Sequence, residues 1–126
     1  VGFTQREDIF TKKTPTLDIN TAASGTSRTA RTLVVPVGIV VQAMVQGEAT
    51  GITTHYCHFS ALTDTDVAAT DGTTAAPYMS CGFDGTSQYM TRLNIFTNTS
   101  AQIASRSTVN SDLDIHTYGW IDARID

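Results

Sequence analysis

Lysine, and charged residues in general, are scarce in this 126-residue chain. Two residues are lysines and only 16 % are charged, whereas soluble domains average about 25 % charged residues. Hydroxyl side chains take their place, with 22 threonines and nine serines. Threonine is β-branched and suits half-buried strands, while a helical protein of this size would carry more Lys, Glu and Leu. This composition excludes a helix bundle.

Long apolar runs and an excess of positive charge are also missing. No apolar run approaches the ~20 residues that a membrane-spanning helix needs, so we expect no membrane span. The formal net charge is −4 and the pI is about 5.1. These values argue against a nucleic-acid partner, because wrapping nucleic acid needs a basic face. Residues 1–8 become polar within five positions, which predicts that no signal peptide opens the chain.

Cysteine is nearly absent, with only Cys57 and Cys81 in the chain. Two thiols allow one bridge, and a secreted chain short of core would use more of them. We interpret both as free thiols and keep a Cys57–Cys81 disulfide as the alternative.

Period-two alternation of apolar and polar residues predicts an all-β chain. The clearest run is 39–46, in which Ile39, Val41, Ala43 and Val45 face one way. Gly47–Gly51 is predicted to turn the chain after it. Further strands are predicted at 17–19, 29–35, 52–62, 79–83, 88–97, 101–107 and 113–125, with turn signals such as Asp84-Gly85 between them. We predict one antiparallel, jelly-roll-like β-sandwich domain over residues 17–126, preceded by an N-terminal arm or edge strand at residues 1–16.

Two groups of side chains could hold a metal ion. His55 and Cys57 share a strand face, and Cys81 or His116 could join them, but the spacing matches no zinc finger or ribbon. The long segment Thr63–Pro77 carries three aspartates, yet the EF-hand pattern fails when counted from Asp64. We therefore expect a core thiol beside partly buried imidazoles, with His58 on the other face, and a solvated acidic loop.

Catalytic signals are weak. A pair of Cys57 with His116 is conceivable, but no GxSxG elbow is present and nothing near Cys57 in the sequence would lower its pKa. Asp112 and Asp114 share a strand face, as glycosidase carboxylates can. They alternate with Leu113 and Ile115, which is typical of a solvent-facing strand side. We expect no catalytic residue, no metal and no cofactor.

The last strand and the N-terminal arm carry the candidate interface. Simple alternation puts Tyr118 and Trp120 on one face, opposite Leu113 and Ile115, so that both rings point outward with His116. Exposed aromatics suggest a subunit contact or a sugar-stacking platform. The alternative is that they pack against the second sheet or the arm. Nearly all contiguous charge lies in the arm, and the interface candidates are Arg6, Glu7, Asp8, Lys12, Lys13, His116, Tyr118 and Trp120.

Two segments resemble small structural proteins of tailed bacteriophages. TNTSAQIASR at 97–106 followed by LDIHTYGWIDAR at 113–124 is similar to their T-N-x-x-G-Q-I-x-x-R hairpin and closing T-x-G-W-I-D-x-R strand. RTLVVPVGIVV at 31–41 resembles their V-P-x-G turn. Ala101 replaces the usual turn glycine, and the chain ends Arg124-Ile125-Asp126 instead of with an Arg-Gly pair. The resemblance implies a fold and a setting, and no catalytic residue.

The expected function is that of a non-enzymatic structural protein on the virion surface, made in the host cytoplasm, which decorates or stabilises the capsid or completes the tail. Its expected partners are other copies of itself, with a trimer favoured, and the major capsid or tail protein. One alternative is the tip module of a phage fibre that binds a host receptor or glycan, for which the long loop and the Tyr118/Trp120 pair would serve. A small metal-dependent or Cys/His hydrolase is the second alternative.

Overall fold

The structure is a computed structural model that describes residues 2–50, 54–68, 79–83 and 88–122. Within these residues no helix is present, and the chain forms nine strands. Their bounds are Phe3–Arg6 (β1), Ile9–Thr21 (β2), Thr29–Thr32 (β3), Gln42–Thr50 (β4), His55–Ser60 (β5), Met79–Phe83 (β6), Gln88–Phe96 (β7), Gln102–Ser107 (β8) and Asp112–Ile121 (β9). The predicted turn at Asp84-Gly85, residues 69–77 of the long loop, and residues 123–125 of the last predicted strand lie outside the described residues.

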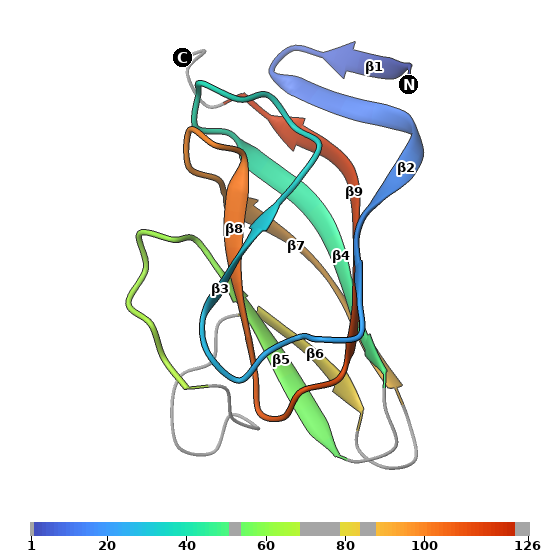
Figure 1. Ribbon diagram of the computed structural model, residues 1–126. Coiled ribbons are helices and arrows are strands. Elements are labelled where there is room, and N and C mark those ends of the chain that lie inside the picture. Colours follow the sequence, from blue (N-terminus) through green and yellow to red (C-terminus); the bar gives the residue numbers. More distant parts are fainter. Residues whose placement is uncertain (1, 51–53, 69–78, 84–87, 123–126) are drawn as a thin grey trace.

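The strands pair antiparallel in the order β1-β2-β9-β4-β7 and β6-β5-β8-β3 (Figure 1). A short pairing of β6 with the first residues of β7 joins the two sheets along one edge. Each sheet interleaves strands from both ends of the chain, since β9 lies between β2 and β4 and β8 lies between β3 and β5. This order is that of a jelly roll built from two Greek keys. The prediction of an antiparallel, jelly-roll-like β-sandwich is therefore confirmed.

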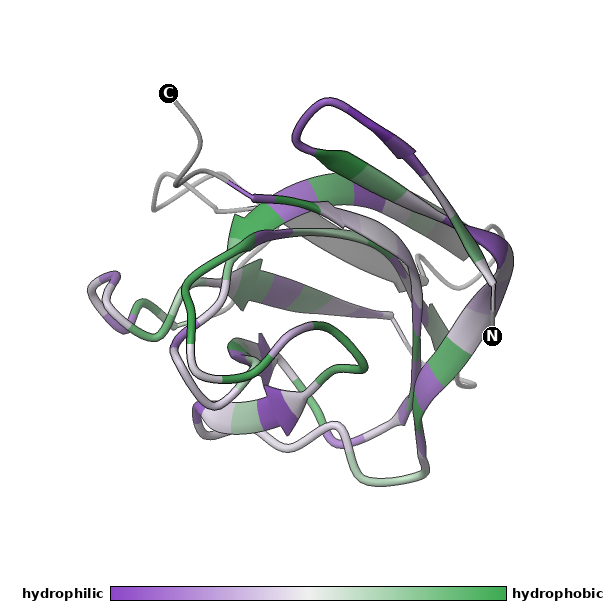
Figure 2. Cartoon of the chain, turned by 90° about the horizontal axis from the view of Figure 1, so that it is seen from above, coloured by the Kyte–Doolittle hydropathy of each residue, from purple (hydrophilic) through white to green (hydrophobic). Residues whose placement is uncertain are grey.

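The core lies between the two sheets. Val41, Ala43 and Val45 are fully buried, as the alternation of run 39–46 predicts. Leu113 and Ile115 of β9 join them from the same sheet, and residues such as Phe59 and Ile103 meet them from the other sheet. Seen from the end of the sandwich, both sheets curve around this shared interior (Figure 2). The burial of apolar surface, which stabilises the folded chain by about 25 cal/mol per Å², is the main term that holds such a core together.

The predicted turn at Gly47–Gly51 is wrong, because β4 continues to Thr50. Gly47 is paired on both sides, with Thr91 of β7 and Ile115 of β9. Ladder hydrogen bonds on both edges keep the backbone extended, so the tertiary setting overrides glycine's preference for turns.

The apolar run at 33–41 is not a pair of strands, although the alternation predicted strand structure at 29–35 and 39–46. β3 ends at Thr32 and β4 begins at Gln42, and the residues between them cross the upper end of the sandwich in Figure 1. Pro36 lacks an N–H, and Gly38 adopts a φ of 83° that other residues rarely take. Two N–H groups of the segment donate to the β7–β8 turn instead, Leu33 to the Ala101 carbonyl and Gly38 to the Thr99 carbonyl.

The turn between β7 and β8 is held by Asn98. Its side-chain oxygen accepts hydrogen bonds from the backbone N–H groups of Ser100 and Gln102, at 3.0 and 2.9 Å. Ala101 has a φ of 60°, in the left-handed region that glycine enters without steric cost. The residue that departs from the resembled hairpin motif therefore occupies the position where a glycine would be the less strained choice.

The N-terminal residues form an edge hairpin of the first sheet. β1 pairs with the start of β2, and Ile9, Phe10 and Thr11 of β2 pair with residues 119–121 of β9. After an irregularity between Thr11 and Thr16, β2 resumes its pairing with β9. The expected boundary between residues 16 and 17 therefore falls within β2.

Candidate functional site

A β-bulge separates the two aromatic residues of β9. Thr117 pairs with Val45 and Gly119 pairs with Met44, so Tyr118 is the extra residue. Residues opposite each other in an antiparallel pair place their side chains on the same face, and the bulge shifts that assignment by one. Trp120 is paired with buried Ala43 and therefore lies on the core side. The expectation that Tyr118 and Trp120 share an outward face is wrong, because simple alternation does not continue through a bulge.

Trp120 is covered by the N-terminal hairpin. Its ring stacks on Phe10, with centroids 5.2 Å apart and an angle of 8° between the planes. Phe3 is tilted against both rings, at 5.6 Å from Phe10 and 5.7 Å from Trp120. The arm thus packs onto the closing strand, as the alternative at the sequence level held, and the Trp120 ring is stacked on Phe10.

Tyr118 lies on the outer face of the first sheet with Arg92. The guanidinium carbon of Arg92 is 5.2 Å from the Tyr118 ring centroid, and its Nε donates to Gln46 Oε1 at 2.9 Å. His116 is on the same face, opposite Gln46 and exposed Leu17. Its Nδ1 is buried and has no hydrogen-bond partner. The structure therefore brings Tyr118 and His116 to one surface and takes Trp120 away from it.

Carboxylates crowd the far end of that outer face. Asp114 is opposite Glu48, and Asp112 lies two residues before it on the same strand. Burial raises the pKa of Asp114, and the charges of Glu48 and Asp112 raise it further, while His116 partly offsets them. None of these acids lines the two pockets described below, and Asp112 is exposed while Asp114 is half-buried, so this cluster is a half-solvated strand face.

The charged residues of the arm do not form one surface. Arg6 ends β1, and Glu7 and Asp8 make the turn into β2, where the Asp8 carbonyl accepts the Asp122 N–H at 2.8 Å. Lys13 is exposed. Its neighbour Lys12 is instead only 7 % exposed, and its Nζ donates to Thr16 Oγ1 at 2.7 Å. Burial lowers the pKa of Lys12, and the nearby Asp18 carboxylate opposes that shift.

Of the candidate catalytic and zinc residues, His55 and Cys57 share β5, and His116 lies apart from them in β9. Cys57 is buried in the second sheet. His116 is on the outer face of the first sheet, so the two do not form a dyad. Within the described part of the chain, no group of three or more His, Cys, Asp and Glu residues could hold a metal ion. Cys81 is the register partner of Cys57, but its side chain lies outside the described residues.

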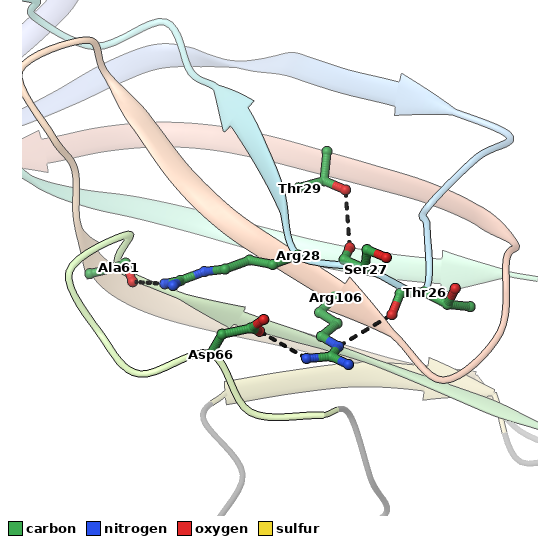
Figure 3. Close-up of polar contacts among 7 residues, drawn as sticks. All are labelled: Thr26, Ser27, Arg28, Thr29, Ala61, Asp66 and Arg106. Atoms are coloured by element: carbon green, nitrogen blue, oxygen red, sulfur yellow. Dashed lines mark hydrogen bonds and ion pairs between the residues drawn. The ribbon is translucent and has the colours of Figure 1, made fainter.

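Two aspartates of the long loop, Asp64 and Asp66, hold that loop in place through hydrogen bonds. Asp64 Oδ2 accepts the Ala61 N–H at 3.1 Å. Asp66 forms an ion pair with Arg106 at 3.0 Å, and Arg106 also donates to the Thr26 carbonyl (Figure 3). A second arginine, Arg28, donates a hydrogen bond to the Ala61 carbonyl oxygen at 2.6 Å (Figure 3). These two carboxylates serve separate partners and do not converge on a calcium site, and Asp71 lies outside the described residues.

An exposed apolar surface at the upper end of the sandwich was missed at the sequence level. We define it as the valine rim: Val37, Val40 and Phe96, which are 71 %, 45 % and 48 % exposed. Val40 and Phe96 line a groove of about 690 Å³, whose floor includes Phe59, Leu93 and Ile95. Large exposed apolar side chains gathered at one place mark contact sites. The signal was the run VVPVGIVV, in which the apolar residues on both sides of a predicted turn at Pro36-Val37-Gly38 were assigned to strands.

Comparison of the chain with protein-family models, with curated protein sequences and with solved structures finds no match. Among the described residues there is also no helix long and apolar enough to cross a membrane. The class of protein therefore rests on the fold and the site alone: a jelly-roll domain with an apolar rim at one end.

Proposed function

We propose that this chain is a non-enzymatic structural protein on the surface of a tailed-phage virion, where it decorates or stabilises the capsid or completes the tail. The fold supports the proposal, because jelly rolls are a common architecture of capsid proteins. The resemblance of residues 31–41, 97–106 and 113–124 to small phage structural proteins supplies the setting.

The valine rim is the observation that carries the proposal. Val37 extends into solvent from a segment that is anchored on both sides, through the Leu33 and Gly38 N–H groups. An apolar side chain that is 71 % exposed on a fixed backbone contributes little to the stability of the isolated chain. Its removal from water by contact with a partner protein would stabilise the complex.

The partner is a second copy of the chain, and beyond it the major capsid or tail protein. Homo-oligomers with closed symmetry are the commonest assemblies, and a trimer is our favoured state. The groove beside the rim offers a receptacle for an apolar side chain of the neighbouring copy. Contacts of this kind need no titratable groups, in keeping with the low charge of the chain.

The contact is tested by the solution mass of the wild-type chain and of Val37→Asp, measured by light scattering over a range of concentrations. We expect the wild type to form an oligomer. Val37→Asp should shift it to the monomer with at least tenfold weaker association, because burying an unpaired carboxylate in an apolar contact is costly. The substitution should leave folding intact, since Val37 makes few contacts of its own.

Val109→Asp is the matched control. Val109 is also exposed, at 38 %, but it lies in the turn between β8 and β9 at the opposite end of the sandwich (Figure 1). It should keep the wild-type mass. A wild-type chain that stays monomeric at every concentration, or an oligomer that both variants weaken equally, would contradict self-association through the rim.

A receptor- or glycan-binding tip module is the second candidate, and the groove is the observation that favours it. Thr63 and Asp64 of the long loop line the groove together with Asn94 and Asn98, and the exposed ring of Phe96 lies beside them. Hydroxyl, carboxylate and amide groups around an aromatic ring suit the recognition of sugar hydroxyls. Loss of host-cell binding on Phe96→Ala would favour this reading over assembly.

A further inference from the structure

A second pocket opens between the N-terminal hairpin and the segment after β3. It has a volume of about 330 Å³ and is lined by Phe3, Lys12, Val34, Val35, Pro36 and Trp120. Phe3 and Val34 are 49 % and 60 % exposed and form its mouth. This volume is at the lower end of the range for small-molecule sites, which are mostly apolar and have a few placed polar groups.

The aromatic wall of this pocket is held in place by packing. Phe10 stacks on Trp120 and Phe3 leans on both rings. Gly119 lets β2 approach closely, because a Cβ at that position would overlap the carbonyl oxygen of Phe10. The opposite wall contains Pro36 and is tied to β2 where the Val34 N–H donates to Asp18 Oδ2 at 2.8 Å. A wall set by packing needs little ordering when a ligand binds.

Lys12 is the only charged residue in the lining. Its side chain is more than nine-tenths buried, and its ammonium has one hydrogen bond, to Thr16 Oγ1. No carboxylate of the described residues forms an ion pair with the Lys12 ammonium. The charge of nearby Asp18 favours the ammonium, while Asp18 Oδ2 accepts from Thr117 and from the Val34 N–H. An ammonium has three donors, and within the described residues only one donor of Lys12 has an acceptor.

We propose that this pocket binds a small carboxylate with an apolar body. The carboxylate accepts hydrogen bonds from the Lys12 ammonium, and the hydrocarbon part lies between Trp120 and the Val34–Pro36 segment. The charge is complementary to the one cation of the lining, and no other charged side chain is present to hold a second polar group. The proposal is independent of assembly through the valine rim.

Trp120 is the only tryptophan in the chain, so its fluorescence reports on this pocket directly. The experiment titrates the full chain at neutral pH with hexanoate, with 1-hexanol as the uncharged analogue, and with acetate, which has the charge without the apolar body. We expect a saturable change with hexanoate and at least tenfold weaker responses to the other two. The absence of a saturable change with hexanoate, or equal responses to hexanoate and 1-hexanol, overturns the proposal.

Two variants of adjacent lysines locate the site. Lys12→Met keeps an unbranched side chain of nearly the same length and removes the charge, and it should weaken hexanoate binding at least tenfold. Lys13→Met changes an exposed neighbour and should bind as the wild type does. If Lys12→Met fails to fold by circular dichroism, Val34→Phe replaces it, because a large side chain at the mouth should block the pocket, leave Lys12 intact and add no second tryptophan. Undiminished binding by the folded Lys12→Met, or by Val34→Phe, also overturns the proposal.

Discussion

Tyr118 determines which face of β9 each later residue takes, because it is the unpaired residue of the bulge between Thr117 and Gly119. Without the bulge, Trp120 would point away from the core and Ile121 would point into it. With it, Trp120 is opposite Ala43 and Phe10, while Ile121 is opposite Ile9, which is exposed. One inserted residue thus converts an expected surface platform into a wall of an open pocket.

Gly119 is required at this point by space. A side chain there would meet the Phe10 carbonyl and the Met44 side chain, and the carbonyl belongs to paired backbone that cannot move away cheaply. We expect Gly119→Ala to lower the free energy of unfolding by roughly 1–3 kcal/mol, the usual cost of overpacking, as measured by urea denaturation. Gly2→Ala meets only the flexible Lys13 side chain and should change stability little. Equal stability of both variants would contradict the close approach of β2 to β9.

Asp114 should make stability depend on pH. Its pKa is raised on folding, first by burial and then by Glu48 and Asp112, so the folded chain holds the proton more tightly than the unfolded chain does. Ionisation therefore lowers stability as the pH rises from the ordinary carboxyl pKa through the raised value. Asp114→Asn should be more stable than the wild type at neutral pH and show no gain near about pH 3, as measured by urea titration. A loss of stability at neutral pH would show that the carboxylate is favourably bound.

At the scale of elements, the N-terminal hairpin is both an exposed edge and a part of the first sheet. β1 is an exposed edge strand, whereas residues 9–11 of β2 pair directly with β9. Deleting residues 1–7 should leave a folded chain with a lower melting temperature and a red-shifted Trp120 fluorescence, because Phe3 is lost from the aromatic cluster. Deleting residues 1–16 should cost far more, since it also removes Phe10 and half of β2. Equal melting temperatures for the two truncated chains would contradict the place of residues 9–16 in the sheet.

The alternation of apolar and polar residues correctly predicted the strands that have one buried face and one solvent-facing face. Val41, Ala43 and Val45, and likewise Leu113 and Ile115, are buried because each points into the sandwich from a strand paired on both sides. The same rule failed where the backbone departs from regular pairing. Gly47 stays extended because two neighbours pair with it. Residues 33–41 leave the sheet at Pro36 and Gly38, and the Tyr118 bulge is a register effect that one strand read by itself cannot reveal.

The candidate site could be predicted only in part, for the same reason. Composition and alternation were enough for the sandwich, and the residues of β9 and the arm do meet in space. The pairing of Trp120 with Phe10 depends on a contact between residues 110 positions apart in sequence. The burial of Lys12 depends on the irregularity in β2 between Thr11 and Thr16. Neither contact leaves a periodic signal, so local patterns assigned both residues to the surface.

At the scale of the whole molecule, the jelly roll places its two unusual surfaces side by side. The segment between β3 and β4 carries Val34 of the carboxylate pocket and, six residues later, Val40 of the valine rim. The rest of the described sandwich consists of paired strands, with β1 and β3 at its edges. A small β-sandwich with an apolar surface at one end suits a subunit that is fixed onto a larger particle.

The central claim, that the protein is a structural component of the virion surface, is tested most directly by immunogold labelling of intact particles. The antibody is raised against the purified chain and applied to particles of the phage whose genome encodes it. The account predicts gold at regular positions on the capsid or along the tail of intact particles. Labelling confined to the fibre tips would support the receptor-binding alternative instead. Antigen found only in the host lysate, with purified particles unlabelled, would contradict the account.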